Sequence, residues 1–181
     1  MAMTLSDETL AKAAATGDRA AFATLLERHY DRLHALCWRL TGHQSDAQDL
    51  AHDICASLPA KLAGWRGEAR FTTWLYRVAV NAAHDQRRRQ AVRNKAALGW
   101  GDWEVNRQAD IAEAAAAKDW LAAAMATLSE DLRDTLALTM DADLTQAEAA
   151  AVLGLSEGTI AWRIAEVKKR LRALATQEAI Q

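Results

Sequence analysis

Apolar residues recur at spacings of three and four along most of this chain, and that period limits its fold more than any other feature. Such spacing marks the buried side of an α-helix. It is clearest over residues 19–41, whose apolar side would hold Phe22, Leu25, Leu26, Leu33, Leu36 and Leu40. The chain has a single proline, Pro59, and only 8 glycines, too few for the many tight turns of a sheet-rich protein. The sequence therefore predicts an all-α fold.

Capping residues and glycines divide the chain into separate helices. In order, we expect helices over about 7–16, 19–41 and 46–62, one that begins near Thr72 and runs past Arg87, one over about 113–127, and three capped by Ser129, Thr145 and Ser156. Ser6 and Ser45 are the expected N-caps of the first and third, and Gly42 ends the second. Thr145 and Glu148 have the spacing of a capping box. Three more helices have an expected buried stripe. It is Leu50, Ile54 and Leu58 in the helix over 46–62, and Trp74, Leu75, Val78 and Ala82 in the helix that begins near Thr72. In the helix capped by Ser156 it is Ile160, Ile164, Val167 and Leu171.

The apolar period fades over residues 96–112, which predicts two small helical domains, 1–95 and 113–181, joined by a linker. The linker holds Trp100 and Trp103, which either dock on a partner or pack on the adjacent helices. In the second domain a short helix, a turn at Gly154 and a second capped helix form a helix-turn-helix. The second helix of such a motif fits the major groove of DNA.

Charge is sorted into blocks along the chain. Residues 61–99 carry nine Lys/Arg and two Asp/Glu, residues 100–150 carry three and eleven, and residues 151–181 carry five and three. Two basic surfaces separated by an acidic stretch indicate two contacts with a polyanion such as nucleic acid. The alternative is that the basic runs are only solvated helix faces.

Other classes of protein find less support. Cys37 and Cys55 lie in apolar-periodic segments, where free thiols pack as small apolar groups. Each has a histidine three residues before it, His34 and His52, so a zinc site is a geometric alternative, although core thiols are far commoner. No catalytic residue, metal or cofactor is predicted, because no nucleophile motif or glycine-rich phosphate loop is present. No apolar run approaches the roughly 20 residues of a membrane span and no signal peptide is visible, so we expect a cytoplasmic protein.

Four stretches, in order, resemble bacterial sigma factors of the extracytoplasmic-function (ECF) group, sigma-70 factors with only two conserved domains. They are Asp46–Asp53 (DAQDLAHD), Phe71–Asn81 (FTTWLYRVAVN), Asp85–Arg89 (DQRRR), and Leu128–Arg133 followed by Leu144–Leu171. The resemblance spans about residues 20–172. It implies a factor without enzymatic activity that binds core RNA polymerase and directs promoter-specific transcription initiation, with an anti-sigma protein as a further partner.

The resemblance also implies roles for individual residues. Domain 1–95 would bind polymerase and recognise and melt the −10 element as single-stranded DNA, and domain 113–181 would read the duplex −35 element. The polymerase-binding residues would be Asp46, Asp49, Leu50, His52 and Asp53. The −10 residues would be Trp65, Arg66, Arg70, Asn81, Asp85, Arg87, Arg88 and Arg89. The −35 residues would be Ser156, Thr159, Trp162, Arg163, Glu166, Lys169 and Arg170.

The chain departs from the family pattern in two places. The acidic helix has Gln48, His52 and Cys55 where the family usually has Glu, Gln and an aromatic residue. The recognition helix has Trp162 in place of a serine and Glu166 in place of a basic residue, so either an unusual −35 sequence is read or this face serves another partner. The alternative function is a helix-turn-helix regulator that never engages polymerase and has no need of Asp49 or Asp53.

Overall fold

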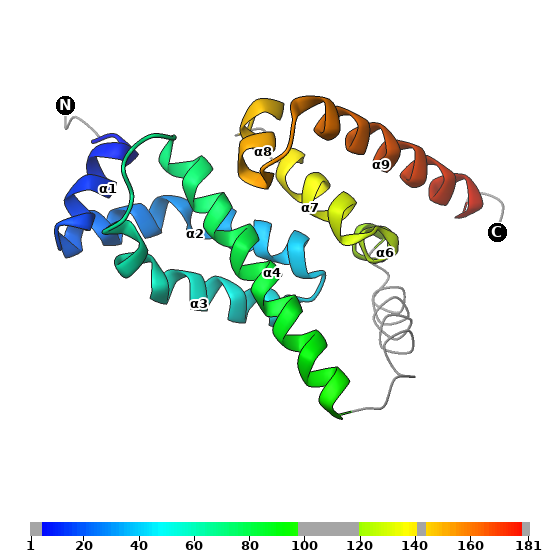
Figure 1. Cartoon of the computed structure of the whole chain (residues 1–181), viewed down its shortest axis with the longest axis horizontal. Coiled ribbons are helices and arrows are strands. Elements are labelled where there is room, and N and C mark those ends of the chain that lie inside the picture. The colour runs from blue at the N-terminus through cyan, green and yellow to red at the C-terminus, as the bar shows by residue number, and fades with distance from the viewer. Residues whose placement is uncertain (1–4, 98–119, 141–143, 179–181) are drawn as a thin grey trace.

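The computed structural model describes residues 5–97, 120–140 and 144–178, and in these ranges the chain forms helices and no strand (Figure 1). The helices are α1 (Asp7–Ala15), α2 (Arg19–Thr41), α3 (Gln44–Leu62), α4 (Phe71–Ala97), α6 (Trp120–Thr127), α7 (Glu130–Thr139), α8 (Gln146–Leu153) and α9 (Glu157–Glu178). The prediction of an all-α fold is confirmed.

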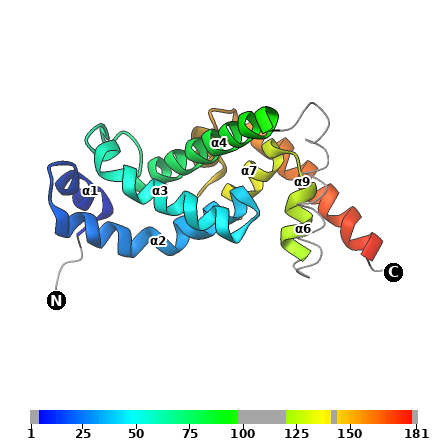
Figure 2. The ribbon, with the colours of Figure 1, turned by 90° about the horizontal axis from the view of Figure 1, so that it is seen from below.

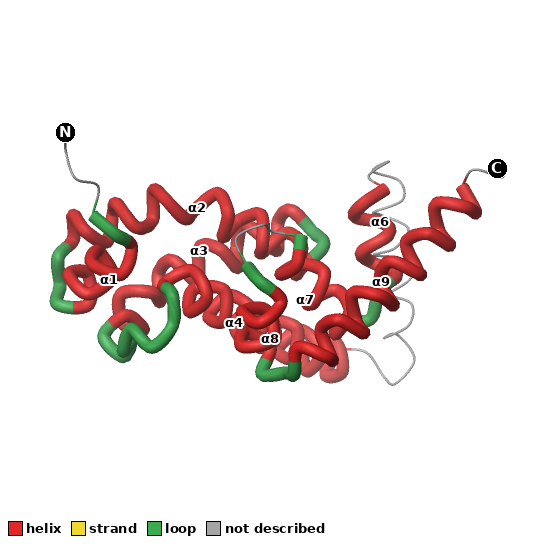
Figure 3. Tube along the Cα trace, turned by 90° about the horizontal axis from the view of Figure 1, so that it is seen from above, coloured by secondary structure: helices red, strands yellow, loops and turns green. Residues whose placement is uncertain are grey.

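The N-terminal helices (α1–α4) and the C-terminal helices (α6–α9) lie side by side. α4 packs on α2 and α3 and also against α8, while α2 also touches α7. Figure 1 shows α4 running obliquely between the bundle of α1–α3 and the pair α7–α8. Figures 2 and 3 show the same order from below and above, with α9 at the far end from α1. The central position of α4 places it against both halves of the molecule.

Most of the expected helix ends are confirmed. The Ser6 side chain accepts from the Thr9 backbone N–H, and Thr145 and Glu148 form the capping box. Gly42 and Gly154 end α2 and α8 with φ of 78° and 67°, a left-handed conformation that favours glycine. The prediction for Ser45 is wrong: α3 begins at Gln44 with His43 as its N-cap, so Ser45 lies inside the first turn. Ser129 is the N-cap of α7, but its side chain makes no capping hydrogen bond.

The expected apolar stripes are buried in part. In α2 the four leucines at 25, 33, 36 and 40 are buried, while Phe22 and Leu26 are half-buried. In α4 Leu75 is buried, but Trp74, Val78 and Ala82 are only half-buried. The fully buried side of α4 is wider than predicted and includes Phe71, Tyr76, Ala79, Val80 and Ala83. The reason is tertiary, because α4 is contacted on more than one side.

One apolar core continues from the N-terminal helices into the C-terminal ones. Ala137, Leu138, Leu144, Ala149 and Val152 belong to the same buried cluster as the core of α1–α4. A second, small cluster of Leu128, Leu132 and Val167 lies within the C-terminal helices. α4 extends to Ala97, beyond the expected boundary at 95. The linker tryptophans and the start of the helix expected over 113–127 fall outside the described residues, and the domain boundaries stay a prediction.

Candidate nucleic-acid and polymerase interfaces

The acidic residues predicted to meet polymerase lie on α3. Asp49, His52 and Asp53 are exposed and Asp46 is half-buried. Positions 49 and 53 are one turn apart and therefore share a face of the helix. Leu50 is a correction: it is 2% exposed in the apolar core, so it seats α3 on its neighbours and offers no contact surface. The structure thus presents a small acidic face.

The loop over 64–70 leads from α3 into α4. Trp65 is half-buried, with its ring centroid 6.2 Å from that of Phe71 and 6.4 Å from that of Trp74. Its Nε1–H is buried and finds no acceptor among the described residues. Arg66 and Arg70 are exposed. The indole therefore anchors the loop on α4, and its stacking on a DNA base stays a prediction.

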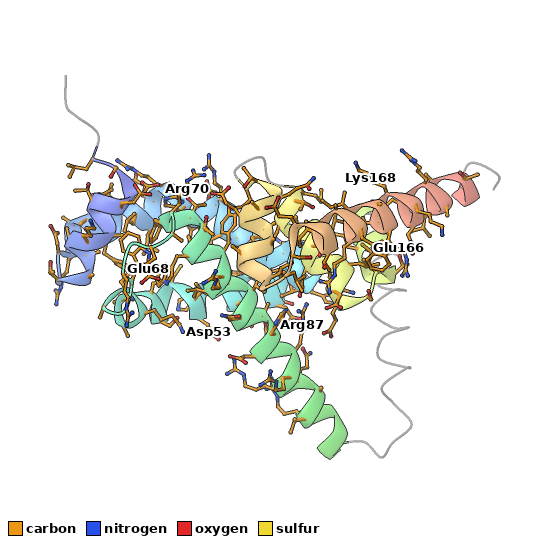
Figure 4. All side chains as sticks on the ribbon, turned by 45° about the horizontal axis from the view of Figure 1, so that its top comes forward. Asp53, Glu68, Arg70, Arg87, Glu166 and Lys168 are labelled. Carbon is orange, nitrogen blue, oxygen red and sulfur yellow. The ribbon has the colours of Figure 1, made fainter. Side chains whose placement is uncertain are left out.

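Four of the five predicted −10 residues on α4 face solvent. Asn81, Asp85, Arg88 and Arg89 are exposed. Arg87 differs, since only 19% of its side chain is exposed. Figure 4 shows Arg87 on α4 where that helix faces α7. The basic run of α4 thus divides into arginines open to solvent and one arginine already bound within the chain.

The partner of Arg87 is Asp134 of α7, a buried carboxylate that is 3% exposed. Arg87 donates from Nη1 and Nη2 to Oδ1 at 3.1 Å each, and from Nη2 to Oδ2 at 2.9 Å. His84 Nε2 lies 2.6 Å from the same Oδ2. Burial alone would raise the pKa of Asp134, but the bonds from His84 and Arg87 and the charge of Arg87 outweigh it and hold that pKa below its ordinary value of 3.8.

We call His84, Arg87 and Asp134 the α4–α7 cluster. Beside it lies an open cleft of about 330 Å³, which Arg88, Glu130 and Asp131 also line. Asp134 is not among the site residues predicted from the sequence. The available signal was the charge sorting, because α7 belongs to the most acidic block and α4 to the most basic.

Three more arginines of the N-terminal helices reach the C-terminal helices. Arg70 lies 3.1 Å from the Glu148 carboxylate, Arg77 donates to the Ala151 carbonyl at 2.7 Å, and Arg39 donates to the Ala137 carbonyl at 3.0 Å. The bond to the Thr145 backbone N–H is the largest cause of the lowered Glu148 pKa, and Arg70 adds to it. Two predicted −10 residues, Arg70 and Arg87, are therefore engaged by acids of the C-terminal helices.

On α9 the predicted −35 residues differ in how freely they project. Trp162 is 64% exposed, and Lys169 is exposed. Arg163 is half-buried and pairs with Asp131 of α7 at 2.9 Å, and its contact with DNA stays a prediction. Glu166 pairs with Arg170 at 2.9 Å, a contact that lowers the pKa of Glu166. Ser156 accepts from the Thr159 backbone N–H at the start of the helix. Trp162 is thus the largest freely projecting side chain of this set.

The other groups considered from the sequence are placed as follows. Cys37 is buried, and burial raises the pKa of its thiol to about 12; Cys55 is half-buried. Within the described ranges, no three His, Cys, Asp or Glu residues gather in a way that could hold a metal ion. No described helix is long and apolar enough to cross a membrane.

Comparison with known proteins identifies the family. The Sigma-70 region 2 family matches residues 25–93, and the Sigma-70, region 4 family matches residues 118–171. The ECF RNA polymerase sigma factor SigM of Mycobacterium tuberculosis is 34% identical over 170 residues, which cover 93% of this chain and 84% of SigM. The chain belongs to the ECF RNA polymerase sigma factors. Such a factor directs promoter-specific transcription initiation and is not itself catalytic.

Other ECF sigma factors are similar over nearly the whole chain. CnrH of Cupriavidus metallidurans is 30% identical, with 93% of this sigma factor and 94% of CnrH covered. The solved structure of CnrH in complex with the cytosolic domain of CnrY matches with a TM-score of 0.71 and 28% identity, over 94% of this chain and 97% of that one. The two-domain, all-α architecture with a C-terminal helix-turn-helix is confirmed.

The pKa of Asp134 predicts a pH dependence for this sigma factor. A carboxyl whose pKa is lower in the folded state adds stability above its unfolded pKa and loses it as the pH falls through the folded pKa. We therefore expect the difference in unfolding free energy between the native chain and Asp134→Asn to be constant above about pH 5 and to shrink below 3.8. Urea denaturation of both proteins over this pH range measures it. A difference that does not change with pH would contradict the assignment.

Proposed function

We propose that this ECF sigma factor contacts core RNA polymerase through Asp49, His52 and Asp53 of α3, with Asp46 beside them. The loop over 64–70 and the exposed face of α4 bind the −10 element as single-stranded DNA. The N-terminal half of α9 binds the −35 element in the major groove. The protein acts in the cytoplasm, where polymerase and the chromosome are.

The observation that carries this proposal is the exposed polar face of α4. Asn81, Asp85, Arg88 and Arg89 project from it, and the loop with Arg66 leads directly into it. Arginines hold phosphates and so position the strand, while amide and carboxylate groups can contact base edges. A regulator that bound only duplex DNA through its helix-turn-helix would have no use for this second surface.

An anti-sigma protein is the proposed regulatory partner. CnrH, which is similar over nearly its whole length, was solved with the cytosolic domain of CnrY. A partner that covered α3 or α4 would compete with polymerase or DNA for the same exposed side chains. The acidic and basic faces of these helices give it charge to recognise.

Transcription in vitro tests the function. Core RNA polymerase is supplied with fragmented genomic DNA with and without this protein, and the 5′ ends of the RNA are mapped. We expect new start sites that share two upstream sequence elements. Duplex DNA binding by the full chain without any new start site would favour the helix-turn-helix regulator instead.

Removing two adjacent exposed arginines of α4, Arg88 and Arg89, tests the DNA surface. We expect Arg88→Ala with Arg89→Ala to weaken binding of a labelled single-stranded oligonucleotide about tenfold. Each phosphate neutralised on a single strand contributes about 0.7 to the slope of log affinity against log salt, so that slope should fall by about 1.4. Fluorescence anisotropy across a salt series measures both quantities.

The matched control for this variant removes the same two charges elsewhere. Arg19→Ala with Arg32→Ala lies on α2, away from the proposed DNA surface, and both side chains are exposed. If the control weakens binding as much as the α4 variant, the oligonucleotide responds to net charge and α4 is not its site.

A further inference from the structure

The most basic helix of this chain and its most acidic segment bind each other. Arg87 of α4 holds Asp134 of α7 through both terminal nitrogens, and Arg70 at the start of α4 holds Glu148 of α8. Figure 4 places the two arginines at separate points along the contact between α4 and the C-terminal helices. These contacts join parts of the chain that are 47 and 78 residues apart in sequence.

The contact at Arg87 uses the groups that a phosphate would need. A guanidinium binds carboxylate and phosphate with the same fork of N–H donors. Both terminal nitrogens of Arg87 already donate to Asp134, and Nη1 also reaches the Leu40 carbonyl at 3.4 Å. The remaining nitrogen, Nε, is buried. Arg87 therefore cannot bind a DNA phosphate while α7 stays in this position.

We propose that Asp134 occupies Arg87, and Glu148 engages one nitrogen of Arg70, in place of DNA phosphates, so that α7 and α8 must move away from α4 before the −10 strand can bind fully. The closed arrangement, in which α4 contacts α7 and α8, is thus autoinhibited. This inference rests on the proposed function, because it takes α4 to be the DNA-binding face. It adds that the competitor for this face is carried by the chain itself.

The composition of the contact makes such an exchange reversible. Opening replaces the carboxylate partners of the two arginines with phosphate partners. The charged hydrogen bonds that are lost and those that are gained are of similar strength. The apolar side of the contact, where Ala137, Leu138 and Val152 join the main core, sets the free energy that opening must overcome. The apparent DNA affinity is the intrinsic affinity multiplied by the fraction of chains that are open.

The test compares Asp134→Asn with Glu130→Gln in the full chain. Each substitution removes one negative charge from α7. The largely exposed Glu130 carboxylate forms only a long ion pair with Arg87, 3.7 Å from Nε, so its loss leaves all hydrogen bonds among His84, Arg87 and Asp134 in place. We expect Asp134→Asn to bind a labelled single-stranded oligonucleotide of mixed sequence about tenfold more tightly than the native chain. Glu130→Gln should stay within about twofold of the native chain. The tenfold gain corresponds to about 1.4 kcal/mol.

Arg88→Ala, made in the native chain and in Asp134→Asn, distinguishes a failure of the autoinhibition from a failure of the proposed DNA-binding face of α4. If Arg88→Ala weakens binding but Asp134→Asn does not strengthen it, the autoinhibition is wrong and the DNA surface stands. If Arg88→Ala changes nothing in either background, α4 is not the DNA surface and both ideas fail.

Hydrogen exchange on the native chain gives a test that needs no variant to fold. Saturation with the oligonucleotide should speed amide exchange in α7 and α8, because DNA binding would draw them away from α4. Slower or unchanged exchange in these two helices would overturn the proposal.

Discussion

Replacing Asp49 and Asp53 together with alanine is expected to weaken binding to core RNA polymerase about a hundredfold. The two carboxylates are exposed and one turn apart on α3, where they repel each other in the free protein. A basic partner surface removes that repulsion, so each acid contributes about 1.4 kcal/mol, or a factor of ten. Titration of labelled protein with core polymerase measures the affinity, and run-off transcription measures its consequence.

The chain offers a closely matched control for this variant. Glu27 and Asp31 of α2 are also exposed, also acidic and also four residues apart. Glu27→Ala with Asp31→Ala should leave polymerase binding within about twofold. Equal losses in the two double variants would show that net charge, and not the face of α3, governs the affinity.

Leu36→Ala is expected to lower the free energy of unfolding by about 3 kcal/mol. Leu36 is 0% exposed within the main apolar core. Truncating a buried leucine loses its transfer free energy and leaves a cavity, which together cost about 2–5 kcal/mol. Urea denaturation followed by circular dichroism gives the value.

Leu5→Ala makes the same chemical change at a side chain that is 54% exposed. Its backbone carbonyl, which accepts from Arg28, is unaffected by the substitution. We expect a loss below about 0.5 kcal/mol. A loss at Leu36 no larger than at Leu5 would mean that the core assigned to α2 is wrong.

Local chemistry made much of the fold predictable. Ser6, Thr145 and Gly154 act within one helical turn, so their capping roles could be deduced from neighbouring residues alone. Ser45 shows the limit of such reasoning. A serine near a helix start is a good N-cap, yet α3 begins one residue before it, after His43. Helix ends can move by a residue or two at little cost, so local preference does not fix them.

The candidate site also contains residues whose exposure could be predicted from the sequence and residues for which it could not. Four predicted site residues are exposed, because each lies opposite the apolar stripe of its own helix: Asp49, Asp53, Arg88 and Trp162. Leu50 was assigned to polymerase but is buried in the core, and Arg163 was assigned to DNA but already pairs with Asp131 within the chain. Helical periodicity gives the face of a helix but does not say what covers that face.

By itself, the sequence determined the helical class, most helix ends, the family and which faces of α3 and α9 are exposed, since these follow from periodicity, capping and motifs within short segments. Only the tertiary structure decided that α4 lies between the two halves of the chain and that Asp134 of α7 binds Arg87 and His84. The charge blocks place opposite charges on α4 and α7, but from the sequence they predicted only contacts with a polyanion and not this contact within the chain. Their contact depends on the packing of α7 and α8 against α2 and α4, which joins residues far apart in the sequence and leaves no local pattern.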